Sequence, residues 1–269
     1  MAESPILAAY AAANTVQGAQ PANAADADAA GAAGLADQLL PLDLAPPAAG
    51  GDAPPSARRP RVLLALTGSV AAVKAAPLAA ALCAFADVRV VATAAALHFF
   101  DPAALPPACG PVLTDADDWR RWRAVGDPVA HIELRRWADA LVVAPLSANT
   151  LAKVANGLCD NLATCVVRAW DFRRPLLAAP AMNTLMWESP FTARHLREAA
   201  ALGVRVVPPV SKRLACGEVG AGGMAEVGDV AAACAAALRE AGFECSAAGA
   251  EEAVRAPTTG ESGDAPPAV

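Results

Sequence analysis

The chain has 269 residues, with 21 basic and 27 acidic side chains and a formal net charge of −6. It contains no cluster of lysine and arginine of the kind that binds nucleic acid, so no nucleic-acid partner is expected. Its longest apolar run, residues 75–86, is shorter than the roughly 20 residues that a membrane helix needs, so no membrane association is expected.

Two segments of low complexity flank the central part of the chain. Residues 1–59 and 243–269 are rich in Ala, Pro, Gly and acids, which favours disordered tails around a single domain at residues 60–242. The first segment is acidic and resembles neither a transit peptide nor a secretory signal. The seven cysteines include no CxxC pair, which favours a reducing compartment and no structural metal. We therefore expect a cytoplasmic protein.

Between these tails, apolar runs of strand length alternate with helical patterns. Strands are predicted at residues 61–67, 88–93, 139–144, 175–179 and 203–207. Helices are predicted at residues 71–86, from residues 145–150 to a break near Gly157, and at residues 190–201 and 229–241. This alternation, with strands apolar throughout, predicts a doubly wound α/β fold of Rossmann or flavodoxin-like type. Such a fold has a mainly parallel sheet with helices on both faces. Residues 212–223, which are polar and glycine-rich, are predicted to form a mobile loop.

Two polar turns follow predicted strands. Gly68-Ser69-Val70 joins a strand to a helix, where N–H groups can hold a phosphate. It is neither a dinucleotide fingerprint nor a P-loop, so a mononucleotide phosphate fits it better; an ordinary N-cap serine is the simpler alternative. In the turn at residues 147–150, one of three hydrogen-bonding side chains would suffice to cap the next helix. The presence of all three favours a polar ligand, but capping alone stays open.

Three further residues have suitable chemistry for a reaction. His131 adjoins a predicted site strand, and its imidazole can exchange a proton near neutral pH, although a lone histidine is more often structural. Asn183 follows a strand in an apolar loop, where an amide can hold a carboxylate without burying a second charge. Cys216 lies near Lys212 and Arg213, whose positive charge favours the thiolate and makes the thiol a usable acid.

The motifs together resemble a known family. Their most specific parts are HIELRRWAD at residues 131–139, APLSANT at 144–150, PAMNTLMW at 180–187 and RLACGE at 213–218. Over residues 61–241 the chain is similar to the homo-oligomeric flavin-containing cysteine decarboxylases, in particular to the plant-type phosphopantothenoylcysteine decarboxylases.

The resemblance implies a set of site residues. The cofactor FMN would be bound by Gly68, Ser69, Val70, Thr93, Ala95, Ser147, Ala148, Asn149, Thr150 and Ala181. The substrate, 4′-phosphopantothenoylcysteine, would be bound by Asn183, Met186, Arg213 and Ala215. His131 and Cys216 would be catalytic, and no metal would take part. The resemblance also implies a homotrimer with shared active sites, in which His131 reaches the site of the neighbouring chain.

A mechanism is implied as well. The thiol end of the substrate would be oxidised by FMN to a thioaldehyde, with His131 as the assisting base. Loss of carbon dioxide would then give an ene-thiolate, and its re-reduction with a proton from Cys216 would give 4′-phosphopantetheine, a step of coenzyme A biosynthesis. One departure from the family lies at residues 94–96, where three alanines replace a lysine and serines. Side-chain hydrogen bonds to FMN from that turn are therefore in question.

Two alternatives share this fold. A regulatory flavoprotein that inhibits a protein phosphatase is suggested by the acidic residues 1–59, since fungal relatives with that activity have acidic tails. A flavin prenyltransferase is disfavoured, because it would not need the motifs around Asn183 and Cys216.

Overall fold

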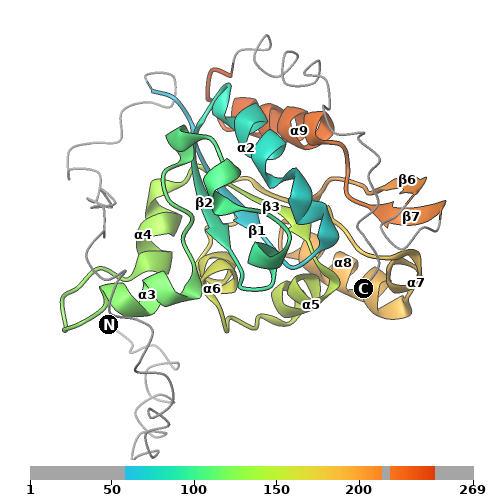
Figure 1. The fold of residues 1–269 in the computed structure, drawn as a ribbon, viewed down its shortest axis with the longest axis horizontal. Helices are drawn as coiled ribbons and strands as arrows, with labels where there is room; N and C mark the ends of the chain where they lie inside the picture. The colour runs from blue at the N-terminus through green and yellow to red at the C-terminus, as the bar shows by residue number, and fades with distance from the viewer. Residues whose placement is uncertain (1–57, 214–218, 246–269) are drawn as a thin grey trace, which may run out of the picture. The chain divides into compact units, whose positions relative to one another are not determined.

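The structure, a computed structural model, describes residues 58–213 and 219–245. Its main sheet has the strand order β2-β1-β3-β4-β5, and every neighbouring pair is parallel (Figure 1). The strands are β1 (Arg61–Leu66), β2 (Asp87–Ala92), β3 (Ala140–Leu146), β4 (Leu176–Pro180) and β5 (Arg205–Val206). The predicted doubly wound α/β fold is confirmed. The tails predicted at residues 1–59 and 243–269 lie mostly outside the described residues and stay predictions.

Helices connect the strands. The α-helices are α2 (Ala75–Cys83), α3 (Asp115–Arg121), α4 (Ala130–Trp137), α5 (Ala148–Asn156), α6 (Leu162–Arg168), α7 (Thr184–Trp187), α8 (Pro190–Ala201) and α9 (Val227–Glu240). Short 3-10 helices are η2 (Val70–Lys74), η3 (Ala96–His98), η4 (Pro102–Ala104) and η5 (Pro107–Cys109). Within the described ranges, no helix is both long and apolar enough to cross a bilayer.

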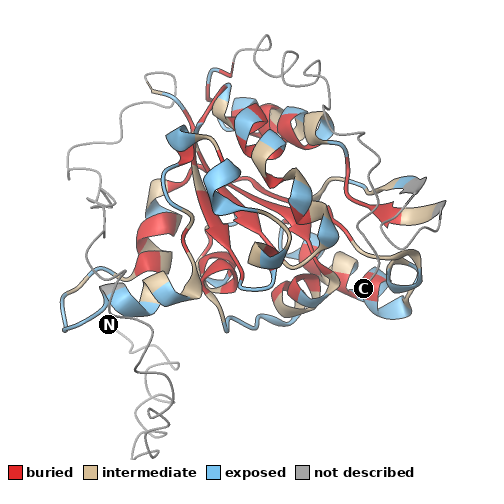
Figure 2. Ribbon diagram, in the orientation of Figure 1, coloured by how far each residue is buried: buried red, intermediate tan, exposed pale blue. Residues whose placement is uncertain are grey.

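The core occupies both faces of the sheet. In β1, Val62, Leu64 and Leu66 pack into one cluster with α2 and α9. The alternate residues Leu63 and Ala65 are also buried, and face the layer that contains α4, α5, α6 and α8. Each such leucine contributes about 1.5–3 kcal/mol through burial. Strands β1, β3 and β4 are buried along almost their whole length (Figure 2), which is why their sequences are apolar throughout rather than alternating.

The prediction of one continuous helix over residues 71–86 was wrong. The segment begins as η2 and becomes the α-helix α2 only at Ala75. Pro77 explains the change, because proline has no N–H to donate to the carbonyl four residues earlier. An α-helix that starts at Ala75 places Pro77 in its first turn. Backbone N–H groups in the first turn have no acceptor within the helix, so the missing N–H of proline breaks no hydrogen bond there.

The prediction of a loop over residues 212–223 was also wrong for the described part of this segment. Strands β6 (Val210–Arg213) and β7 (Val219–Gly223) pair in an antiparallel ladder, with Val210 opposite Gly223. The glycines of β7 serve close packing, because a Cβ at Gly220 would lie 2.2 Å from Thr184 Oγ1. The glycine-rich composition therefore reflects a contact with α7 and not a loop.

Candidate functional site at the carboxyl ends of the strands

The strand order changes direction between β1 and β3. The chain passes from β1 to β2 on one side, and from β3 to β4 and β5 on the other. In open α/β sheets, ligands bind beside such a reversal, in the crevice at the carboxyl ends of the strands. Four predicted binding turns follow β1, β2, β3 and β4: residues 68–70, 93–95, 147–150 and 181–183. The topology therefore brings all four to one edge of the sheet (Figure 1).

Thr67 joins the two strands at the reversal. Its hydroxyl donates to Pro145 O at 2.7 Å and accepts from Ser147 N at 2.8 Å. Thr67 is fully buried. The sequence motifs did not identify it as a site residue. The signal that could have done so is the presence of a polar residue at the end of an apolar strand. Backbone hydrogen bonds of 3.0 Å join the other strand ends, from Thr93 N to Leu66 O and from Ala181 N to Leu146 O.

Replacing Thr67 by valine tests this bridge. Valine keeps the shape but leaves Pro145 O and Ser147 N–H buried without partners, at a cost of about 1–3 kcal/mol each. We expect Thr67→Val to lower the melting temperature and weaken FMN binding, measured by thermal unfolding and flavin titration. Thr67→Ser keeps the hydroxyl and should stay close to the wild type in both. Equal stability of the two variants would contradict the bridging role.

Ser147 and Thr150 serve the helix that follows them. Ser147 Oγ accepts from Thr150 N at 3.2 Å and donates to Thr150 Oγ1 at 3.1 Å, which makes Ser147 the N-cap of α5. Both residues are buried, whereas Asn149 is exposed and Ala148 is partly exposed. Ser147 therefore caps α5. The Asn149 side chain and the N–H groups of the first helical turn remain as donors for an anion.

The turns after β1 and β2 pack against each other. A Cβ at Gly68 would lie only 2.6 Å from Ala95 Cβ, so no other residue fits at Gly68 without a shift. Ser69 Oγ accepts from Ala71 N at 3.4 Å and caps η2, and Val70 is half-exposed. The two turns thus lie side by side, as a shared binding site requires.

The Thr93 hydroxyl is a buried polar group without a protein partner. Within the described part of the chain, Thr93 Oγ1 makes no hydrogen bond, although the residue is only 9% exposed. A buried hydroxyl without a partner costs about 1–3 kcal/mol, so a bound ligand would satisfy it. Because Ala94 and Ala95 have no polar side chains, Thr93 is the side-chain donor of this turn.

The polar groups of the four turns, which we together call the crevice, fit a mononucleotide such as FMN. They are the Thr93 hydroxyl, the Asn149 amide and the N–H groups in the first turns of η2 and α5. These neutral groups suit a phosphate and a polyhydroxyl chain. None of the four turns carries an acidic side chain that would repel an anion.

Asn183 lies beyond the carboxyl end of β4 and caps α7. Its Oδ1 accepts from Met186 N at 3.1 Å, which leaves the two Nδ2 hydrogens for another partner. Met186 itself is 49% exposed, and Ala181 is buried at the start of the same loop. The amide oxygen therefore holds the loop, and the amide hydrogens are the part of this side chain that could donate to a ligand.

The hairpin of β6 and β7 packs on the loop that contains Asn183. Met182 N donates to Gly222 O at 2.9 Å, and Thr184 Oγ1 donates to Ala221 O at 3.0 Å. The residues on either side of Asn183 are thus both tied to β7. The hairpin and the loop form one unit at the edge of the sheet.

Three predicted site residues, Arg213, Ala215 and Cys216, fall at the end of β6 or between β6 and β7 in the sequence. Arg213 ends β6, and its side chain is not described. Ala215 and Cys216 lie outside the described residues. Strands β6 and β7, which precede and follow these residues in the sequence, pair with each other next to the Asn183 loop.

His131 is not brought to the crevice by this chain. It lies in the first turn of α4, which packs on α3 and α6. In Figure 1, α4 is at the left of the sheet, whereas α5 and α7 are at the right. Its Nδ1 lies 3.3 Å from Asp118 Oδ2, and its side chain is 27% exposed. The structure therefore places His131 apart from the four turns and open to the surface.

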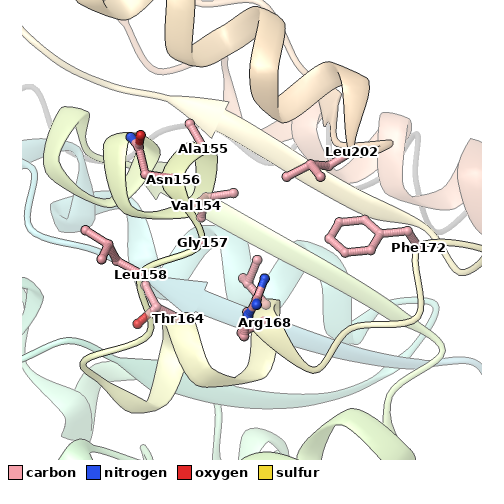
Figure 3. A pocket seen from close by; sticks show the side chains of 10 residues that line it. Val154, Ala155, Asn156, Gly157, Leu158, Thr164, Arg168, Phe172 and Leu202 are labelled. Carbon is pink, nitrogen blue, oxygen red and sulfur yellow. The ribbon is translucent and has the colours of Figure 1, made fainter. Parts of the chain in front are cut away.

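A separate cavity of about 250 Å³ lies near the carboxyl end of α5 (Figure 3). It is lined mainly by apolar residues, together with three polar side chains, Asn156, Thr164 and Arg168. None of the predicted site residues lines it. The crevice at the strand ends is therefore distinct from this cavity.

Comparison with known proteins places the chain in a family. Residues 52–239 match the Flavoprotein family. A phosphopantothenoylcysteine decarboxylase from Arabidopsis thaliana is 59% identical over 169 residues, which cover 63% of this chain and 80% of the relative. A phosphopantothenoylcysteine decarboxylase from Mus musculus is 50% identical over 191 residues, which cover 70% of this chain and 92% of the relative.

Solved structures agree with this assignment. The FMN binding protein AtHal3 is 56% identical with a TM-score of 0.62, over 66% of this chain and 95% of that chain. A mutant PPC decarboxylase complexed with pantothenoylaminoethenethiol is 55% identical with a TM-score of 0.65, over 66% of this chain and 97% of that chain. Because sequence and fold agree over the domain that forms the crevice, the chain belongs to the Flavoprotein family and, within it, to the phosphopantothenoylcysteine decarboxylases.

Proposed function

We propose that this chain catalyses the FMN-dependent decarboxylation of 4′-phosphopantothenoylcysteine to 4′-phosphopantetheine, a step of coenzyme A biosynthesis. The observation that carries the proposal is the meeting of four neutral, donor-rich turns near the β1–β3 reversal, one of which carries Asn183. The family assignment supplies the substrate, because the relatives are named for it.

Different residues of the crevice would bind the cofactor and the substrate. FMN, when bound, supplies the electron acceptor that makes transient oxidation of the substrate's thiol end possible. FMN would be held by Gly68, Ser69, Val70, Thr93, Ala95, Ser147, Ala148, Asn149, Thr150 and Ala181. Asn183 would donate to the substrate carboxylate through the amide hydrogens that its cap leaves unused. Met186, Arg213 and Ala215 would complete the substrate site.

Two residues would handle protons. His131 would take a proton from the substrate as its thiol end is oxidised, because an imidazole is a usable base near neutral pH. Cys216 would return a proton to the product after carbon dioxide has left. The thiol suits this role because nearby positive charge at Lys212 and Arg213 favours its thiolate form.

The position of His131 supports a homotrimer with shared active sites. Within one chain this histidine lies on α4, away from the crevice. Three large apolar residues of the neighbouring segment are exposed: Trp119 is 80% exposed, Trp122 50% and Val125 96%. Exposed apolar groups of this kind mark surfaces that bind other proteins. Docking of this surface on a second copy would bring His131 to the crevice of that copy.

Purified protein should be yellow and should release carbon dioxide from 4′-phosphopantothenoylcysteine without an external electron acceptor. The visible absorption spectrum measures the flavin, and product formation is followed by mass spectrometry. A colourless protein that binds no added FMN and leaves the substrate unchanged would refute the proposal. Heat-denatured protein with free FMN is the control for uncatalysed decay.

Named decarboxylases among the relatives favour the enzyme over a purely regulatory flavoprotein or a flavin prenyltransferase. The acidic segment that suggested phosphatase regulation falls on residues 1–59, mostly outside the described residues. A cytoplasmic location belongs to the proposal, because the substrate and product are intermediates of coenzyme A biosynthesis.

A further inference from the structure

The α3–α4 unit holds an acidic residue against the proposed catalytic histidine. Asp118 Oδ2 lies 3.3 Å from His131 Nδ1, and the two side chains are 20% and 27% exposed. Asp118 is on α3 and His131 is in the first turn of α4, so the contact joins the two helices. No sequence motif pointed to Asp118, because 13 positions separate it from His131.

The other acids at the start of α3 have different partners. Asp117 forms the capping box with Thr114, through two bonds of 2.8 Å to the Thr114 N and Oγ1. Asp115 accepts from Leu162 N at 2.8 Å and so ties α3 to the start of α6. These two anchors hold α3 in place. Of the acidic residues in this turn, Asp118 is therefore the one that contacts His131.

The remaining charged groups near His131 are engaged elsewhere. On α4 itself, Arg136 pairs with Glu133 at 2.8 Å, and Arg135 pairs with Asp171 at 3.5 Å. On α6, burial raises the pKa of the Cys165 thiol to about 11, so the thiol stays neutral near pH 7. Among the described residues, Asp118 is therefore the charged side chain in contact with the imidazole.

The contact selects which imidazole nitrogen can act as a base. A carboxylate is an acceptor only, so a neutral His131 that bonds to it must carry its hydrogen on Nδ1. The lone pair is then on Nε2, the nitrogen on the opposite side of the ring. A base must have this lone pair directed at the proton that it removes.

We propose that Asp118 is a positioning residue for the reaction, whose carboxylate accepts from His131 Nδ1–H and keeps the lone pair on Nε2. The proposal rests on the proposed function, in which His131 is the base. Asp118 itself does not touch the substrate. It holds the ring orientation and the tautomer, as a carboxylate does in other histidine-dependent sites.

The test uses the full-length chain with bound FMN and three variants. Asp118→Asn keeps the size but can place an amide donor against Nδ1, which favours the wrong tautomer. We expect its kcat to fall about 10- to 100-fold, with the KM and the flavin spectrum nearly unchanged. Asp118→Glu should recover part of the loss. Glu133→Gln removes a carboxylate from α4 that does not contact His131, and should keep nearly full kcat.

A second measurement does not depend on turnover. The chain has three histidines, so 15N-histidine NMR with His131→Asn for assignment reports the tautomer of His131. We expect the Nδ1–H form in the wild type and its loss in Asp118→Asn. The same His131 tautomer in the wild type and in Asp118→Asn, or an equal kcat in these two proteins, would overturn the inference. Equal losses in Asp118→Asn and Glu133→Gln, accompanied by lower thermal stability, would mean a structural role and would overturn it too. A wild-type chain without decarboxylation would instead refute the proposed function.

Discussion

His131→Asn is expected to abolish decarboxylation, with a loss of at least about 100-fold, while the protein stays yellow. A general base contributes about 10²–10⁴ to a rate, and asparagine has no group that takes up a proton near neutral pH. Flavin binding should survive because His131 lies on α4, away from the four turns of the crevice. Product formation and the visible spectrum measure the two effects. Retained turnover would refute the catalytic role.

The same variant tests whether the active sites are shared between chains. Asn183→Asp keeps the oxygen that caps α7 but places a negative charge at the proposed site of the substrate carboxylate, so it should also be inactive. Co-expression of the two inactive variants should restore about a quarter of wild-type activity. In a random mixture, half of the chains carry a native Asn183 and the other half carry a native His131. A crevice with native Asn183 therefore meets a native His131 from the neighbouring chain at about one site in four. No recovery in verified mixed trimers would contradict sharing.

Gly222→Ala is expected to lower kcat/KM by about 100-fold with little loss of FMN. A Cβ at Gly222 would lie 2.5 Å from Met182 O, where the backbone cannot move easily. The hairpin would have to shift away from the Asn183 loop, breaking the 2.9 Å bond between Met182 N and Gly222 O. A misplacement of about 1 Å in a substrate-positioning group can cost 10²-fold in rate.

The matched control for this variant is Gly203→Ala. Gly203 has φ +101°, close to the +112° of Gly222, so alanine adds the same kind of backbone strain. Its added Cβ would meet nothing closer than Phe172 at 3.8 Å, which is ordinary van der Waals contact. Gly203→Ala should therefore lower stability somewhat and leave kcat/KM unchanged. Equal effects of both variants on kcat/KM would show that strain, and not the clash with Met182, is responsible.

The sequence by itself determined the strands of the main sheet, the α/β class and the turns at the carboxyl ends of these strands. Strands covered on both faces are apolar throughout, so runs such as residues 61–67 are recognisable without any knowledge of their neighbours. The turn at Ser69 and the turn at Ser147 are equally local, because a cap and the helix it begins are adjacent in the chain. Parallel topology then requires that turns at the carboxyl ends of the strands meet.

Only the tertiary structure decided which distant residues touch. Thr67 bonds to Pro145, 78 positions away, and such a contact leaves no periodicity in the sequence. The pairing of Asp118 with His131 depends on how α3 packs on α4, which no local pattern encodes. Gly220 and Gly222 suggested a loop because glycine permits many conformations, whereas here its missing side chain permits close contact with α7 and its loop. Residue type limits what a segment can do locally, but packing determines which of these possibilities the chain uses.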